Sequence, residues 1–405
     1  MIIIDGILAF LISSALDTNP LKILVCCFFS IWLIFYLKEN DWKLYFSNEA
    51  IVLFFILIIA LVNSAYFYVF SEFSFYVDNN QQMLGIRKFS IEVTFGFFMY
   101  LYLKTKSYDF ILNLVYIGAL ANCIVALIQL PLVLNTSYRA SMLFFEPSSA
   151  GFYYCFSIFL LFMGAGSDKT RKWIAVTFSI LGLIAFSKAQ FLVLAIVALI
   201  CTSYKLKLIS IIMILTMLGF FNSELNNYYD YLVDNNLQLY GLDRLVDSIN
   251  QRGILGLSNA YEVSDTYVTR LSGIYVSFMT LIDYPFGIGA ATFNPVYKQY
   301  LIDHNLVNVF DGGEVDLMLR GEAWASPRSR ILELVVAAGF IGIIGLAYIF
   351  KSFHKERNKS YLIYVAFIST FIAGVMLELN PIIDYFVVLI LLLEKIREGS
   401  NEKNN

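Results

Sequence analysis

The sequence predicts an all-α integral membrane protein with about twelve transmembrane helices and one large loop on a single side of the membrane. Composition gives the first indication. Of the 405 residues, 59% are hydrophobic and only 15% are charged, whereas a soluble domain carries about 25% charged residues. The second indication is distribution: apolar runs of membrane-spanning length fill the chain except between Phe221 and about Arg330.

The apolar runs define the expected spans. A bilayer core needs about 20 apolar residues in a helix, with a range of roughly 17–25. The candidate spans are 2–17, 20–37, 49–70, 86–103, 108–131, 149–165, 172–187, 189–204, 207–221, 331–350, 360–379 and 381–395. The N-terminal run lacks a basic segment and an evident cleavage site, which indicates a retained first span and not a signal peptide.

These spans divide the chain into four parts. Residues 1–220 form a first transmembrane bundle of about nine helices, 221–330 the large loop, 331–395 the C-terminal transmembrane helices, and 396–405 a polar cytoplasmic tail. Tyr and Leu are frequent in the loop, and disordered segments are poor in aromatic residues. We therefore expect short helices there, lying on the outer face.

The positive charges give the orientation. With both termini cytoplasmic, sixteen Lys and Arg residues fall in inside segments and five in short outside segments. The seven in the long loop are discounted, because long domains are translocated regardless of charge. This bias predicts that the loop lies outside the plasma membrane.

Cysteine and histidine give no sign of a disulfide framework or a metal site. The five cysteines lie in apolar runs and none lies in the polar loop, so they are interpreted as small buried residues. The two histidines, His304 and His354, show no ligand spacing. We expect no metal and no cofactor.

A first group of candidate site residues precedes the span that begins near 149. Glu146, Pro147 and Ser148 stand immediately before an apolar run, and Arg139 lies a few residues upstream. Pro fits a first helical turn and Glu complements the helix dipole, so simple capping is an equal alternative. The functional interpretation rests on Arg139, because an Arg near hydrocarbon is costly and its fork suits phosphate.

A second group is the polar break at Ser187 and Lys188, for which a tight turn with a snorkelling Lys is the favoured interpretation. A third begins at Arg270, which leads an amphipathic helix candidate. That helix is closed by Pro285-Phe-Gly287-Ile-Gly289, a turn signal. The spacing does not match a nucleotide-binding fingerprint.

The fourth group lies where the chain returns to the membrane. Arg328 and Arg330 precede a new apolar run, and Glu333 stands one turn further, at a spacing that allows an ion pair with Arg330. An interfacial anchor with a satisfied ion pair is the structural alternative. Asp384 marks the last outer turn, and ionisable residues inside spans are few, Glu92 being the clearest.

These segments together resemble the superfamily of O-antigen polymerases and ligases. The shared features are the span layout, the late outer loop, the Arg…Phe-Phe-Glu-Pro-Ser segment at 139–148, the Arg-led helix closed by Pro-Phe-Gly-Ile-Gly at 270–289, and Leu-Glu-Leu…Gly-Phe-Ile-Gly at 332–342. The resemblance implies a GT-C-like membrane glycosyltransferase whose large outer loop is periplasmic. Its donor and acceptor are undecaprenyl-pyrophosphate-linked glycans at the outer leaflet of the bacterial inner membrane.

The resemblance also implies roles for residues. Arg139, Arg270 and one of Arg328 or Arg330 would converge on the pyrophosphates, while Glu146 and Glu333 are candidates for the catalytic base. Ser148 and Lys188 are added as substrate-binding candidates, and Pro147, Gly287 and Gly289 as structural ones. A flippase and a chain-length regulator are expected partners besides the lipid membrane. Nucleic acid is not an expected partner.

One departure favours polymerase over ligase. Ligases of this superfamily carry a His-Asn-type motif just before the helix that begins here near Ile331, whereas this chain has Pro327-Arg328-Ser329-Arg330. The O-antigen ligase stays an alternative within the class. A polysaccharide flippase or other transporter is the alternative from another class, and a membrane scaffold is a third. The sugar repeat, its linkage and the type of exported glycan are left open.

Overall fold

The computed structural model of the chain describes residues 2–14, 19–70, 79–135, 141–144, 147–182, 188–201, 265–307, 313–322, 325–376 and 382–402. Every regular element in these ranges is a helix. The helices are α1 (Ile2–Ile12), α2 (Asn19–Glu39), α3 (Asn48–Val69), α4 (Asn79–Lys104), α5 (Tyr108–Asn135), α6 (Pro147–Ala165), α7 (Lys169–Leu181), α8 (Lys188–Cys201), α11 (Asp265–Asp283), α12 (Phe293–Asp303), α13 (Gly313–Arg320), α14 (Arg330–Ala338), α15 (Phe340–Lys355), α16 (Tyr361–Met376) and α17 (Ile382–Glu402).

Three of the described helices have the length and apolarity needed to cross a membrane. They are Pro20–Glu39, Asn48–Val69 and Tyr108–Leu132. Ser149–Ala165 and Tyr361–Met376 are shorter apolar helices. The all-helical architecture is therefore that of a membrane-embedded protein, and the full set of twelve spans stays a prediction. The predicted span 207–221 lies outside the described residues.

Two predicted elements differ in the structure. The expected first span, 2–17, has its helix end at Ile12. The expected single span 331–350 is divided at Gly339 into α14 and α15, because Gly339 takes a φ of 64°, which an α-helix does not contain. A glycine accepts this conformation without the steric cost that a side chain would bring.

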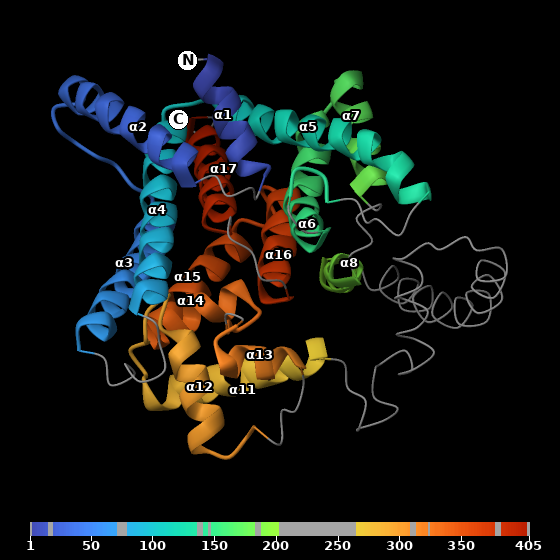
Figure 1. Cartoon of the computed structure of the whole chain (residues 1–405). Coiled ribbons are helices and arrows are strands. Elements are labelled where there is room, and N and C mark those ends of the chain that lie inside the picture. Colours follow the sequence, from blue (N-terminus) through green and yellow to red (C-terminus); the bar gives the residue numbers. More distant parts are fainter. Residues whose placement is uncertain are drawn as a thin grey trace.

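The helices pack around two hydrophobic cores (Figure 1). The larger core joins α1–α8 with α14–α17. The smaller one lies between α11, α12 and α13, which we call the cap, and these three helices lie together at one end of the bundle in Figure 1. Helix α14 contributes to both cores: Ile331 and Leu334 pack into the larger, Leu332 and Val336 into the smaller.

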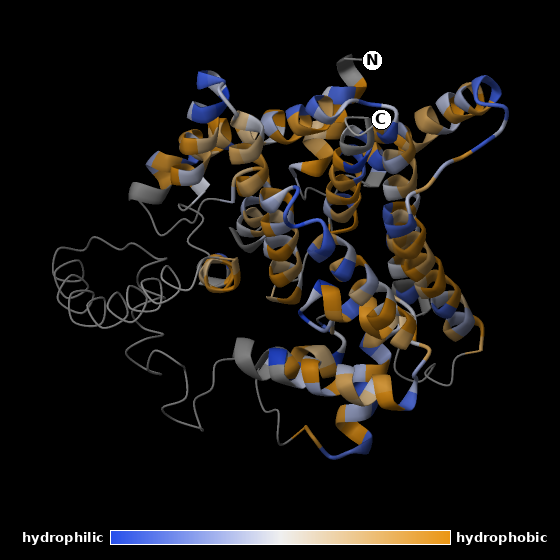
Figure 2. Cartoon of the chain, turned by 180° about the vertical axis from the view of Figure 1, so that it is seen from behind, coloured by the Kyte–Doolittle hydropathy of each residue, from blue (hydrophilic) through white to orange (hydrophobic). Residues whose placement is uncertain are grey.

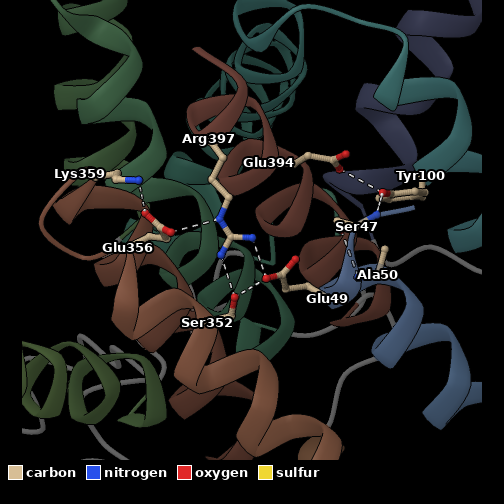
Figure 3. Close-up of polar contacts among 9 residues, drawn as sticks. All are labelled: Ser47, Glu49, Ala50, Tyr100, Ser352, Glu356, Lys359, Glu394 and Arg397. Atoms are coloured by element: carbon tan, nitrogen blue, oxygen red, sulfur yellow. Dashed lines mark hydrogen bonds and ion pairs between the residues drawn. The ribbon is translucent and has the colours of Figure 1, made fainter. Parts of the chain in front are cut away.

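The opposite end of the bundle is held by an ion-pair network (Figure 3). Arg397 of α17 contacts Glu49 of α3 at 2.7 Å and Glu356 at 3.3 Å. Lys104 of α4 pairs with Glu394 at 2.5 Å. Segments with predicted cytoplasmic charges thus meet at one end, where the two termini also lie (Figure 1). The contacts place these segments together, and which side they face stays a prediction.

Candidate functional site

The C-terminal end of α16 is the place where distant polar segments meet. Arg270 of α11 donates from Nη1 to the carbonyl oxygen of Met376 at 3.2 Å. Ser329 donates from its hydroxyl to the carbonyl oxygen of Gly374 at 3.3 Å. Gly273 lies against the backbone of Ser326, so α11 and the segment before α14 are in close contact. The predicted meeting of Arg270 with the Arg328–Arg330 segment is therefore present in the fold.

Local sequence explains how α14 begins at this place. Ser329 is extended, and its hydroxyl accepts a hydrogen bond from the backbone N–H of Leu332 at 3.2 Å, as an N-cap residue does. The residue before it, Arg328, has a φ of 54°. A left-handed backbone is uncommon for a residue with a long side chain and occurs often at binding sites. Arg328 is thus held in a strained turn directly before the helix.

Arg330 is bound by two carboxylates. Its Nη2 lies 2.9 Å from an oxygen of Glu92 on α4, and its Nη1 lies 2.5 Å from an oxygen of Glu333. The predicted pairing of Arg330 with Glu333 is present, but Arg330 is buried and is not an interfacial anchor. Because both carboxylates compensate its charge, Arg330 is better suited to fixing α14 than to binding a ligand anion.

A second buried ion pair lies beside this one. Lys22, near the start of α2, contacts Asp384 in the first turn of α17 at 3.4 Å. Gly96 of α4 lets α17 approach closely beside this pair, since a β-carbon there would lie only 2.8 Å from Cγ2 of Ile383. The ammonium of Lys22 lies 5.1 Å from the ring centroid of Phe95, one turn from Glu92. Buried ion pairs therefore join α2 to α17 and α4 to α14.

The turn at 285–289 fits into the break between α14 and α15. Ile288 and Gly289 donate their backbone N–H groups to the carbonyl oxygens of Val336 and Ala337, at 3.1 and 3.0 Å. The backbone N–H of Phe340 donates to Pro285, at 2.8 Å. These bonds satisfy backbone groups that a broken helix leaves unpaired, which a membrane interior requires.

Glycine is required in this turn for steric reasons. Gly287 and Gly289 have φ values of 90° and 85°. A β-carbon on Gly287 would collide with the backbone of Ala337 and Gly339, and one on Gly289 with the backbone of Ser64. The side-chain amide of Asn63 on α3 closes the junction by donating to the carbonyl oxygens of Phe286 and Ala337, at 2.7 and 3.0 Å.

The cap contains a buried ammonium. Lys298 of α12 is 8% exposed, its Nζ lies near Gly321, and it has no charged or hydrogen-bonding partner in the described part of the chain. Burial lowers the pKa of Lys298. Nearby, Tyr300 donates to Asp283, and burial together with this acceptor raises the pKa of Tyr300. His304 stacks on Tyr300 with ring centroids 5.4 Å apart.

Not every predicted site residue falls within the described structure. Arg139 and Glu146 lie outside it. Pro147 and Ser148 begin α6, and Lys188 begins α8, but their side chains are not described. The predicted helical start at Pro147 is confirmed. Arg270 and the segment around Arg328 lie at the end of α16, whereas Arg330 pairs with Glu333 and with Glu92 of α4. The relation of Arg139 and Glu146 to these residues stays a prediction.

The site includes residues that sequence reasoning left out of it. Glu92 is the partner of Arg330. Asn63 and Ser64 hold the 285–289 turn through hydrogen bonds. The hydroxyl of Ser64 accepts its hydrogen bond from the backbone N–H of Ala290 at 2.8 Å. Glu92 carried a usable signal, because an acid in the middle of an apolar run needs a partner. Asn63 gave a weaker signal of the same kind.

The chemistry available at this place is anion binding. A guanidinium presents a planar fork of donors that matches phosphate and carboxylate. Arg270 is half-buried, and no carboxylate of the described residues forms an ion pair with it. The described residues contain no group of three or more Asp, Glu, His or Cys side chains arranged to hold a metal ion. Arg270, with Arg328 nearby, is thus the principal candidate for a ligand anion.

A comparison of the chain with known protein families, with curated proteins and with solved structures finds no match.

Proposed function

We propose that the chain is a membrane glycosyltransferase that polymerises polyprenyl-pyrophosphate-linked oligosaccharide repeat units at the periplasmic face of the bacterial inner membrane. In this reaction the growing glycan leaves its lipid pyrophosphate and joins a hydroxyl of the next lipid-linked unit. The product is O-antigen, capsule or another exported polysaccharide. Undecaprenyl pyrophosphate is the leaving group.

The observation that carries the proposal is the position of Arg270. Its guanidinium lies at the end of α16 beside the strained turn at Arg328, and its charge is not neutralised by a described carboxylate. A pyrophosphate leaving group needs its developing negative charge stabilised, and fixed guanidinium groups do this well in a site that excludes water. Arg330 and Glu333 are bound to each other, so in this proposal they orient the site, and Glu146 becomes the better candidate for the base.

The first experiment replaces Arg270 by Ala in a strain that lacks the chromosomal gene. We expect long-chain polysaccharide to fall by roughly 100-fold or more, which is the usual effect of removing one group that stabilises transition-state charge. Arg270→Lys should restore only part of the long-chain polysaccharide, because an ammonium lacks the planar pair of donors that a guanidinium presents to phosphate. Arg87→Ala is the matched control, since Arg87 is an exposed cation on α4. Normal chain length in Arg270→Ala would remove the proposal's main support.

The same strain separates polymerase from ligase. Loss of a polymerase leaves single repeat units on lipid A–core, whereas loss of a ligase leaves bare core. The glycan profile of the deletion strain, before any substitution, decides between them.

A transporter is the second candidate, because two observations favour it. Transporters often contain broken helices and buried charges at mid-membrane, and this chain has the α14–α15 break and the ion pairs of Lys22 and Arg330. Purified protein in vesicles with lipid-linked repeat units distinguishes the classes. A polymerase lengthens the glycan without a gradient, while a flippase moves single units across the membrane and leaves their length unchanged.

A further inference from the structure

We infer that α11 is an in-plane membrane helix whose outer face lies against the acyl chains of bilayer lipids. The observation behind this is a row of exposed apolar side chains on the cap. Ile274, Phe278 and Ile282 are 52%, 63% and 57% exposed, and Phe286 just beyond the helix is 74% exposed. These residues are spaced by four, so the three helical ones lie on one face of α11.

The opposite face of α11 explains why the row points outward. Ser272, Val276 and Thr280 are fully buried, and Val276 belongs to the cap core. The helix therefore already uses one apolar face for packing. The second, exposed row has no role in the packing of the described residues, and exposed apolar rows of this size mark a contact with a partner or with lipid.

The depth of the turn that follows α11 identifies lipid as the partner. The backbone of Phe286 accepts a hydrogen bond from Asn63, which lies six residues before the end of the membrane-spanning helix Asn48–Val69. At 1.5 Å per residue, this contact is about 9 Å inside the end of the span. An exposed phenylalanine at that depth beside a spanning helix faces hydrocarbon.

The surrounding surface is continuous with this row. On α3, Ile58, Val62 and Tyr66 are exposed on either side of Asn63. On α15, Phe340 is exposed, and its N–H donates to the residue before Phe286. The row on α11 thus extends the apolar surface of α3 and α15 across the end of the bundle. Figure 2 shows α11 lying across the bundle in this way, with hydrophobic residues along it.

This placement has a consequence for Arg270. It precedes Ile274 by four residues and so lies on the same face of α11, at the other end of the row. If α11 faces lipid, the guanidinium of Arg270 lies at the lipid boundary, where it can contact the anionic headgroup of a lipid. The placement itself depends only on the protein being embedded in a membrane, and not on the reaction proposed above.

Site-directed spin labelling of the full chain tests the placement. In a variant whose five cysteines are replaced, single cysteines are introduced at Ile274, Phe278 or Ile282, and the protein is placed in nanodiscs of phosphatidylethanolamine and phosphatidylglycerol. Ile58 is the lipid-facing control and Asp303, exposed on α12, the water-facing control. Collisions with oxygen and with a water-soluble nickel chelate are measured at each position.

We expect labels on α11 to behave like the label at Ile58, with oxygen collisions exceeding nickel collisions. Nickel accessibility equal to that at Asp303 would show a water-facing helix and overturn the inference. Protection from both reagents would show a protein partner over α11 and overturn it equally. Each result stands whether or not Arg270→Ala abolishes polymer, so failure of the lipid contact and failure of the proposed reaction are distinguishable.

Discussion

Arg330 is the residue whose role the structure changes most. From the sequence it is one of two equivalent candidates for pyrophosphate binding, but in the fold Glu92 and Glu333 neutralise it. A buried ion pair is costly to break, because the remaining charge stays buried without compensation. Arg330 therefore fixes the placement of α14, and in the proposed function Arg270 and Arg328 are the arginines that bind the ligand.

Replacing Glu92 by Gln tests this assignment. The neutral amide retains one acceptor but no charge, so we expect the free energy of unfolding in detergent to fall by about 1–3 kcal/mol. Glu49→Gln is the control, since Glu49 is also a buried carboxylate bound to an arginine, at the opposite end of the bundle. Both should lose stability, but only Glu92→Gln should lower polymer yield. Equal losses of polymer would show that Glu92 matters for folding alone.

Lys298 gives a prediction about pH. Burial lowers its pKa below the ordinary value of 10.5. As the pH falls below 10.5, the unfolded chain takes up a proton more readily than the folded chain, so this residue lowers folded-state stability at neutral pH and not above 10.5.

Lys298→Met keeps the apolar stem and removes the ammonium. We therefore expect a higher thermal midpoint in detergent at pH 7, and a smaller gain near pH 10.5. A lower midpoint for the variant at pH 7 would mean that the ammonium is stabilised in the folded cap.

At the scale of elements, α14 links the cap to the bundle. It supplies side chains to both cores, its start is fixed by Arg330, and its end is fixed by the 285–289 turn. The two segments at 285–289 and 339–342, which the sequence presents as separate motifs, form one junction. The junction joins the end of α11, the helix that carries Arg270, to α14, whose first residues follow Arg328.

Gly287→Ala tests the junction. The left-handed backbone costs a non-glycine residue about 1–2 kcal/mol, and the added carbon collides with the backbone of Ala337. We expect a loss of stability at least as large as this, measured by thermal unfolding in detergent. Gly6→Ala is the control, because nothing lies within 4 Å of a β-carbon there. If Gly287→Ala unfolds at the wild-type temperature, the close packing does not exist in solution.

At the scale of the whole molecule, the fold has two distinct ends. One carries the cap and the candidate site, and the other carries the termini and the network around Arg397 (Figure 3). Arg171 of α7 also donates a hydrogen bond to the side-chain oxygen of Asn113 at 2.8 Å. This contact places the first turns of α5 and α7 together, at the end of the molecule that carries the termini. This segregation agrees with the charge bias that predicts a cytoplasmic face.

Cysteine labelling in spheroplasts tests the orientation. In the cysteine-free background, Asn305→Cys lies in the turn after α12 and Lys169→Cys at the start of α7, and both positions are exposed. A membrane-impermeant maleimide should label the first in intact spheroplasts and the second only after lysis. The reverse pattern would invert the topology and place the candidate site in the cytoplasm.

The sequence predicted helices better than their connections. The runs at 49–70 and 360–379 correspond within a few residues to α3 and α16, because long apolar periodicity is a strong local signal. The run at 381–395 predicts the start of α17, but this helix continues to Glu402 through most of the segment expected as a polar tail. The break at Gly339 was missed, since an isolated glycine in an apolar run is compatible with a continuous helix. Its left-handed backbone arises from the 285–289 turn, some fifty residues away in the chain.

By itself the sequence determined the membrane-embedded helical class, the boundaries of the strongest helices, the turn at 285–289 and the pairing of Arg330 with Glu333. Each of these follows from residues close together in the chain. Only the tertiary structure decided which arginine lacks a carboxylate partner among the described residues, because one of the two carboxylates that neutralise Arg330 comes from Glu92, 238 positions away. The physical reason is that the partners of a buried charge decide whether it can bind a ligand anion, and these partners are brought together by the packing of four helices.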